Sequence, residues 1–310
     1  MNRTTACLAA LTLLATPTAL AETKSYAAQP FDEIEAGGAI DVIYERADTP
    51  SIRVEQADGD FSDLYLDFDG DTLVVSRNSV RDRSGWFKNV SIRVKDNRKI
   101  VKVNGKQVPY YLVRVSGPRL DGVQAKSSAK LVVNGLESDN FSARASSSGD
   151  LELNGMAAKA QLHASSSGDI LARDLTTDFL DIHASSSGDV EVKALGVSRV
   201  KIEASSSGDV ELESRDGAEY TIEASSSADV ELEGSCSSIN VEASSSADVD
   251  ANGLQCKEAN VTASSSADVS VYASDSVTAQ ASSSGDIYVV GSPSIRDVTR
   301  SSGGDVDFGN

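Results

Sequence analysis

The chain has 310 residues, with 28 basic and 47 acidic side chains and a formal net charge of −19 at pH 7. The acidic excess is spread along the sequence, which argues against a nucleic-acid-binding protein and against electrostatic binding to anionic lipid, since both need a basic surface. Hydrophobic residues make up 40% of the chain but aromatic ones only 5%, so a thin core of small aliphatic side chains is expected.

Residues 1–21 have the pattern of a secretory signal peptide. Arg3 gives a positive start, Ala6 to Ala15 form a short apolar stretch, and Ala19-Leu20-Ala21 is a small-x-small cleavage site. The apolar stretch is shorter than the roughly 20 residues of a membrane-spanning helix. We therefore expect an extracytoplasmic protein, in the periplasm or at the cell surface, without membrane insertion.

The segment 22–124 contains short apolar runs separated by turns rich in Asp and Gly. Runs such as Ile40-Asp-Val-Ile-Tyr44 and Tyr111-Leu-Val-Arg-Val115 alternate as strands do. A charged insertion lies around Arg77 to Arg98. We interpret 22–124 as irregular β coils and a cap that protects the edge of the sheet from pairing with other chains.

The segment 125–310 consists of regular repeats of about 20 residues. The hexapeptide Ala-Ser-Ser-Ser-Gly-Asp, or its variant with Ala in place of Gly, recurs along this segment. A fixed period of this length is the signature of a repeat architecture. The copies begin at Ala145, Ala164, Ala184, Ala204, Ala224, Ala243, Ala263 and Ala281.

Within each repeat, apolar and polar residues alternate with a period of two. Before and after Asp209, for example, Val200, Ile202, Val210 and Leu212 fall on one face of the predicted strands. One repeat cannot bury this face alone, so it must stack on its copies. The expected fold is all-β, a single-stranded parallel β-helix, right-handed by the usual crossover preference. The same alternation places the second Ser of each triplet, such as Ser206, inside the helix.

These features resemble the head GIN domain family of proposed autotransporter adhesins. The resemblance is carried by Phe31-Asp-Glu-Ile34 with Gly38-Ala-Ile-Asp-Val42, by Val113-Arg-Val-Ser-Gly-Pro-Arg-Leu120, and by the repeated Ser-Gly-Asp copies. It implies an extracytoplasmic β-helix of a bacterial envelope, with adhesion as its suggested role. It supplies no catalytic residue for this chain.

Two cysteines occupy equivalent positions in adjacent repeats. Cys236 and Cys256 each precede the Asp of their repeat by twelve residues. Stacked rungs lie about 4.8 Å apart, within the range of Cα separations that a disulfide requires. An exported chain is exposed to oxidising conditions, so we predict a Cys236–Cys256 disulfide.

The aspartates that occupy the same position in successive repeats form the candidate binding feature, which we call the acidic ladder. Asp in this position is common turn chemistry, because its carboxylate accepts hydrogen bonds from nearby backbone N–H groups. Carboxylates about 5 Å apart also repel, and weak Ca²⁺ or Mg²⁺ binding would relieve that repulsion. No other cofactor is expected. The ladder comprises Asp150, Asp169, Asp189, Asp209, Asp229, Asp248, Asp268 and Asp286.

Both histidines, His163 and His183, lie six residues before the Asp of their repeat. Two imidazoles on adjacent rungs are a candidate site for a transition metal. Surface residues without a ligand are the simpler interpretation, because a straight row of side chains does not make a tetrahedral site.

The favoured function is an exported, non-catalytic adhesin-like or envelope-binding protein. The ladder would present hydroxyl and carboxylate groups at a fixed pitch to a glycan or to another envelope or surface protein. A periplasmic structural or stress-related protein is the alternative. A polysaccharide-active enzyme is less favoured, because the repeats are uniform and no serine has a recognisable partner histidine.

Overall fold

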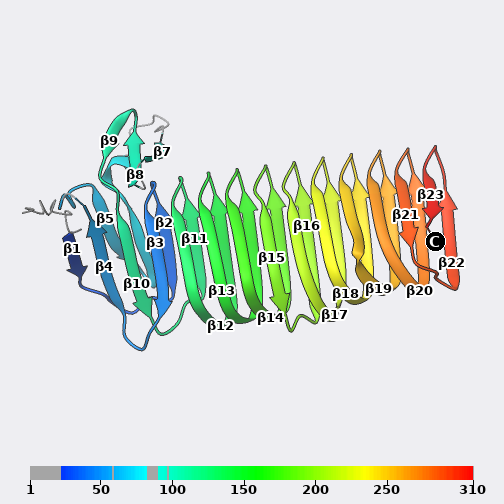
Figure 1. Cartoon of the computed structure of the whole chain (residues 1–310), viewed down its shortest axis with the longest axis horizontal. Helices are drawn as coiled ribbons and strands as arrows, with labels where there is room; N and C mark the ends of the chain where they lie inside the picture. The colour runs from blue at the N-terminus through cyan, green and yellow to red at the C-terminus, as the bar shows by residue number, and fades with distance from the viewer. Residues whose placement is uncertain (1–21, 58, 82–89, 96–97, 310) are drawn as a thin grey trace, which may run out of the picture.

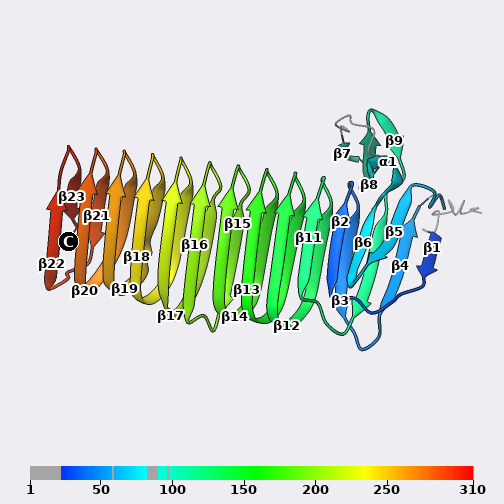
Figure 2. The same cartoon turned by 180° about the vertical axis from the view of Figure 1, so that it is seen from behind.

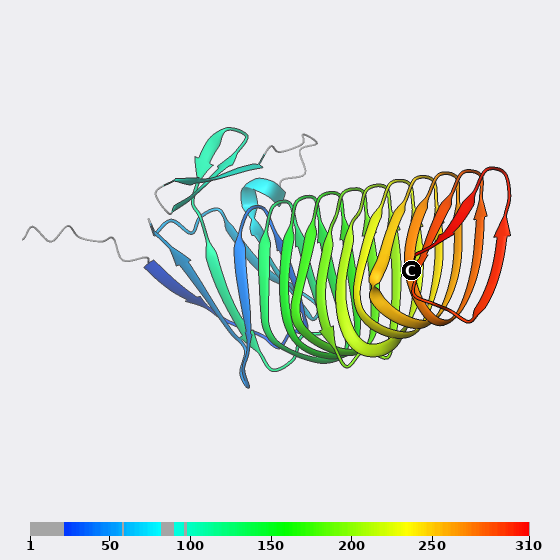
Figure 3. The same ribbon diagram turned by 45° about the vertical axis from the view of Figure 1, so that its right-hand side comes forward.

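The computed structural model describes residues 22–57, 59–81, 90–95 and 98–309. The chain is 73% strand and 1% helix and forms a β-solenoid of about nine turns with mostly parallel pairing. Figure 1 shows the rungs stacked side by side along the long axis, and Figure 3 shows them circling a common interior. The predicted parallel β-helix is therefore confirmed; its right-handed sense stays a prediction. The predicted signal peptide lies outside the described residues.

The repeats stack in register, each residue above its counterpart. Ala145 pairs with Ala164, and Ala164 with Ala184, because this register keeps every inward side chain above another inward side chain of the same kind. The strands of the regular part are β12 (Lys130–Ser146), β13 (Asp150–Ser165), β14 (Asp169–Ser185), β15 (Val190–Leu195), β16 (Arg199–Ser205), β17 (Val210–Ser225), β18 (Asp229–Ser244), β19 (Asp248–Ser264), β20 (Asp268–Ser282), β21 (Asp286–Val290), β22 (Ile295–Arg300) and β23 (Asp305–Phe308).

The core is a narrow space filled by the inward side chains of opposite walls. In β17, Leu212, Tyr220 and Ile222 are buried, whereas the alternating Glu211 and Glu223 are exposed. The first Ala of each hexapeptide is at most 3% exposed in all eight copies. Small side chains are needed there because the two walls converge at the corner.

Each hexapeptide forms a sharp corner with an unusual backbone. Ser147 and Ser148 have φ angles of 52° and 61°, and the N–H of Gly149 donates to the carbonyl of Ser146 across 3.0 Å. Two successive left-handed residues closed by this hydrogen bond make a type I′ turn. The preceding rung leaves no room for a side chain at Gly149, whose Cβ would lie 2.5 Å from backbone atoms of Ala125.

The prediction that the second Ser points inward is wrong. Ser147, Ser166, Ser186 and Ser206 are exposed. The cause is the left-handed pair of residues, which reverses the chain within two positions and interrupts the strand alternation. Both central Ser side chains of each corner therefore face solvent, and only the first Ser of the triplet is half-buried.

The N-terminal end stacks in an order that differs from the chain order. The rung formed by β2 (Glu33–Gly37) and β3 (Asp41–Arg46) lies directly against β11 (Gly122–Lys126) and β12. Strands that lie between β3 and β11 in the chain stack on the outer side of this rung. On one wall the order continues from β3 to β10 (Leu112–Gly117), β4 (Ser51–Gln56) and β1 (Glu22–Tyr26). On the other wall it continues from β2 to β6 (Thr72–Arg77) and β5 (Leu64–Asp69).

The outer strands of this end pair antiparallel, unlike the regular rungs. The pairs β1–β4, β4–β10 and β5–β6 are all antiparallel. Antiparallel pairing ends the parallel stack, because it does not repeat the rung geometry on which another rung could be added.

A separate three-stranded antiparallel sheet follows the short helix α1 (Asn78–Arg81). It consists of β7 (Val90–Lys95), β8 (Arg98–Val103) and β9 (Lys106–Val108). Figures 1 and 2 show this sheet projecting from the N-terminal end, beyond the row of sharp corners. We call it the basic sheet, because its strands contain six Lys or Arg residues and no Asp or Glu.

A fully buried arginine holds the base of this projection. Arg77 donates to the carbonyl oxygens of Gly38 and Pro109, each at 2.6 Å, and its guanidinium lies 3.2 Å from a carboxylate oxygen of Asp63. Its side chain also lies over the ring of Tyr111. Arg77 therefore joins the first corner of the solenoid to both ends of the inserted segment.

Candidate functional site

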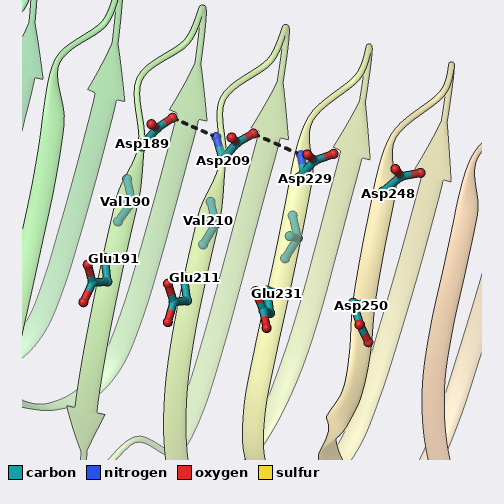
Figure 4. Close-up of a pocket in the computed structure, with 11 residues that line it drawn as sticks. Asp189, Val190, Glu191, Asp209, Val210, Glu211, Asp229, Glu231, Asp248 and Asp250 are labelled. Carbon is teal, nitrogen blue, oxygen red and sulfur yellow. Dashed lines mark hydrogen bonds between the residues drawn. The ribbon is translucent and has the colours of Figure 1, made fainter.

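The acidic ladder runs along one edge of the solenoid, immediately after the corners. Figure 4 shows Asp189, Asp209, Asp229 and Asp248 at the same height on successive rungs. All eight ladder aspartates are exposed. Direct register pairs link Asp150 with Asp169, Asp229 with Asp248, Asp248 with Asp268 and Asp268 with Asp286.

Part of the ladder is tied together by hydrogen bonds. The backbone N–H of Asp209 donates to a carboxylate oxygen of Asp189 across 3.4 Å, and the N–H of Asp229 donates to Asp209 across the same distance. In the same way, a carboxylate oxygen of Asp169 accepts a hydrogen bond from the backbone N–H of Asp189. These side chains thus have the structural role expected for Asp at a corner, in addition to any ligand they bind.

A second acidic stripe lies two residues further along each strand. Glu191 pairs in register with Glu211, Glu211 with Glu231, and Glu231 with Asp250. The stripe is shorter than the ladder, because Leu171 and Ser270 occupy its column on either side. The two rows line a shallow surface groove of about 500 Å³, whose other lining residues are Val190, Val210 and Val230.

Four of the ladder aspartates, Asp150, Asp169, Asp209 and Asp248, have raised pKa values and bind protons more tightly than isolated carboxyls do. Partial burial raises the pKa of Asp209, the hydrogen bond from Asp229 opposes this, and the neighbouring carboxylates Asp189 and Asp229 raise it further. Burial and like-charged neighbours also raise the pKa values of Asp150, Asp169 and Asp248. The ladder therefore stores electrostatic repulsion at neutral pH.

Within the described residues, cations contact the column of the ladder near its two ends. At the C-terminal end, Arg300 forms an ion pair with Asp305, the register partner of Asp286. Lys130 occupies the column between Asp41 and Asp150, and it forms an ion pair with Glu152. Lys99 of the basic sheet pairs with Asp41, which also accepts a hydrogen bond from Tyr110 at 2.7 Å. From Asp209 to Asp268 no Lys, Arg or His among the described residues lies within ion-pair distance of a ladder carboxylate.

The contact of Lys99, in the basic sheet, with Asp41, in the column that leads to the ladder, was absent from the sequence-based expectations. The signal that pointed to it was the local charge, since the strands of the basic sheet contain six basic residues in a chain of net charge −19. The position of the sheet could not be inferred, because the inserted segment has no repeat that pairs it with a rung.

The structure joins Cys236 and Cys256 in a disulfide. They are register partners on β18 and β19, their Cα atoms lie 4.5 Å apart, and both side chains are buried. The disulfide lies on the side of the rungs opposite the corners. The rungs are less regular there, and the register shifts between Glu231 and Glu233.

The two histidines are neighbours, with ring centroids 5.9 Å apart. Both ring nitrogens of His183 contact carboxylates, Nε2 at 3.2 Å from Asp181 and Nδ1 at 3.0 Å from Glu203. Burial, His183 and Arg144 lower the pKa of His163. Throughout the described segments, no group of three or more His, Cys, Asp or Glu residues is arranged to hold a metal ion.

The chain matches a family described as "Putative auto-transporter adhesin, head GIN domain" over residues 30–215 and again over 193–293. The chain belongs to the head GIN domain family. The second match shows that the family pattern extends through the rungs that carry the acidic ladder.

Several solved structures are similar to this chain, including three from Bacteroides and Parabacteroides species. A "putative adhesin" from Parabacteroides merdae is 17% identical over 94% of this chain and 98% of its own, with a TM-score of 0.44. A "putative adhesin" from Bacteroides fragilis has the same identity and coverage and a TM-score of 0.35. A "putative lipid binding protein" from Parabacteroides distasonis has a TM-score of 0.43. No curated protein matches the chain.

As a head GIN domain protein, the chain is an adhesin-like β-helix. In the part of it that the structure describes, no helix has the length and apolar character needed to cross a membrane.

Proposed function

We propose that this chain is an exported, non-catalytic binding protein that uses the acidic ladder to attach to a glycan or to a protein of the envelope or of another cell surface. The observation that carries the proposal is the row of in-register carboxylates from Asp209 to Asp268, which have no cationic partner among the described residues. Membership in an adhesin-type family supports the same conclusion.

The arrangement suits a ligand that is itself extended and repetitive. Carboxylates recur on every rung at a spacing of about 4.8 Å, so a polymer lying along the edge meets the same group many times. A single exposed ion pair contributes about 0–1 kcal/mol, and useful affinity therefore requires many simultaneous contacts. Amino groups of a glycan or Lys and Arg of a protein are the complementary chemistry.

The described surroundings of the histidines support a non-catalytic role. His183 is held by Asp181 and Glu203, and its ring contacts no serine hydroxyl among the described residues. The groove along the ladder is lined by the same repeated carboxylates and Val side chains on each rung, which suits repeated contacts with a polymer.

Protease treatment of intact producing cells, followed by immunodetection of the chain, tests location. Loss of the chain while a periplasmic control protein survives is the expected result. Complete protection contradicts the adhesin proposal and favours the periplasmic structural alternative.

Binding is tested with the purified mature chain and immobilised chitosan oligosaccharides, which carry amino groups. We expect binding that weakens in the double variant D229N/D248N and in high salt. The matched control E242Q/E258Q removes two exposed carboxylates away from the ladder and should bind like wild type. Equal binding by the ladder variant and the control would show that the ladder is not the binding surface.

A further inference from the structure

The basic sheet and the acidic ladder are two oppositely charged surfaces on one molecule, and most of each is unpaired. Arg93 and Lys106 are exposed, and Lys102 is half-exposed. None of these three has an ion-pair partner among the described residues. The ladder likewise has no cation partner from Asp209 to Asp268 in the described structure.

One ion pair between the basic sheet and the column of the ladder is already present within a single molecule. Lys99, on β8, forms an ion pair with Asp41, which belongs to the same column as Asp150. The ammonium group of Lys99 also lowers the pKa of Asp150, against the effects of burial and of Asp169. Ammonium groups of the basic sheet are therefore accepted at the start of the ladder.

The rest of the ladder is out of reach of the molecule's own basic sheet. Asp209 lies three rungs beyond Asp150, and each rung adds about 4.8 Å. The basic sheet is anchored at its base by Arg77, which contacts Gly38 and Pro109. The remaining carboxylates are therefore available to cations of another molecule.

Two of these cations share one face of the basic sheet. Ser91 is the register partner of Lys102, so Arg93, two residues after Ser91, lies on the same face as Lys102. Lys106 lies on the opposite face, because it precedes Gln107, the other register partner of Lys102. Ser91 and Gln107 are the register partners of Lys102, so small or neutral residues flank its ammonium group. The sheet projects beyond the row of corners (Figures 1 and 2), where another molecule can approach it.

We propose that the basic sheet of one molecule docks on the acidic ladder of a second copy of this chain. The two surfaces are different patches, so the contact is heterologous and can continue from copy to copy into longer assemblies. The partner's basic sheet occupies the stretch from Asp209 to Asp268 and the adjacent Glu211 and Glu231. This inference does not depend on the external ligand, because it requires only the charges of the chain itself.

The test is analytical ultracentrifugation of the mature full chain at about 20 mM and about 500 mM NaCl, which span weak and strong screening. Wild type should sediment as assemblies at low salt and as a monomer at high salt. The basic-sheet variant R93E/K102E and the ladder variant D229K/D248K should each be monomeric at low salt. The matched control E242K/E258K has the same charge change as the ladder variant, off the ladder, and should assemble like wild type.

Mixing the two monomeric variants provides the decisive measurement. The basic-sheet variant retains an intact ladder, and the ladder variant retains an intact basic sheet, so together they should form a one-to-one complex that grows no further. Circular dichroism and melting temperatures matched to wild type show that each variant is folded. The proposal is overturned if wild type is monomeric at low salt, if the control loses assembly as the ladder variant does, or if the mixture stays monomeric. Binding of the basic sheet to an anionic glycan in place of the second copy would appear as this last outcome.

Discussion

The carboxylate of Asp209 accepts a hydrogen bond from the backbone N–H of Asp229 across 3.4 Å, so a charged side chain ties one rung to the next. The same carboxylate has like-charged neighbours on both sides, Asp189 and Asp229. One residue therefore contributes a stabilising hydrogen bond and a destabilising repulsion, and the two effects can be separated experimentally.

The variant D209N should be more stable than wild type at pH 7. Asn keeps an oxygen that can accept from Asp229, but it removes one charge from the row. Repulsion of about 1 kcal/mol for each of the two neighbouring pairs in water predicts a rise of about 3–4 °C in melting temperature. Differential scanning calorimetry at low salt measures the difference, and E258Q, which removes a charge outside the ladder, serves as control.

The gain in D209N should disappear in acid. The pKa of Asp209 is raised in the folded protein, so the folded chain binds the proton more tightly than the unfolded chain. The stabilisation that comes from protonated Asp209 is complete below the ordinary carboxyl pKa of about 4. It is lost as pH rises through the raised pKa that Asp209 has in the folded chain. A gain that is as large at pH 3 as at pH 7 would contradict the electrostatic explanation.

The corners should be strained at their central serines. Ser206 and Ser207 have φ angles of 53° and 61°, a conformation that costs a residue with a Cβ about 1 kcal/mol and a β-branched residue more. We expect S207G to match or exceed wild-type stability and S207V to lose about 2 kcal/mol or more. Urea unfolding measures both, with S205A, outside the left-handed pair, as the reference. Equal stability of S207V and wild type would rule out this strain.

Removing the disulfide should weaken the C-terminal rungs. The double variant C236A/C256A should lose about 3 kcal/mol, since the bridge closes a loop of about 20 residues. Alanine fits these positions, because Ala218 and Ala273 already occupy the same column on the adjoining rungs. Reductant should lower the stability of wild type and leave the variant unchanged; a wild type insensitive to reductant after unfolding would contradict the prediction.

Replacing Arg77 should detach the basic sheet. In R77M the carbonyls of Gly38 and Pro109 lose their donor and Asp63 loses its ion partner, which we expect to cost about 3–5 kcal/mol. R77K should also be impaired, because one ammonium group cannot reach all of these acceptors. Hydrogen exchange should show lost protection in β7 to β9 while β17 to β19 keep theirs. Unchanged protection in the basic sheet would show that Arg77 does not anchor it.

The sequence by itself determined the regular solenoid, the acidic ladder and the alignment of Cys236 with Cys256. Repeats of equal length stack on their own copies, so the neighbour of each residue is its counterpart one repeat away. Position in the repeat is then sufficient to place a side chain, and the strand alternation tells which face it occupies.

Only the tertiary structure decided the backbone of the corners, the stacking order at the N-terminal end and the position of the basic sheet. At Ser206, strand alternation predicted an inward side chain, but the turn is set by backbone hydrogen bonds and by contact with the adjoining rung, which reverse its direction. The partners of β4, β6 and Lys99 come from distant, non-repeated segments. Their pairing depends on which chain segments fit together in space, and local periodicity carries no information about that choice.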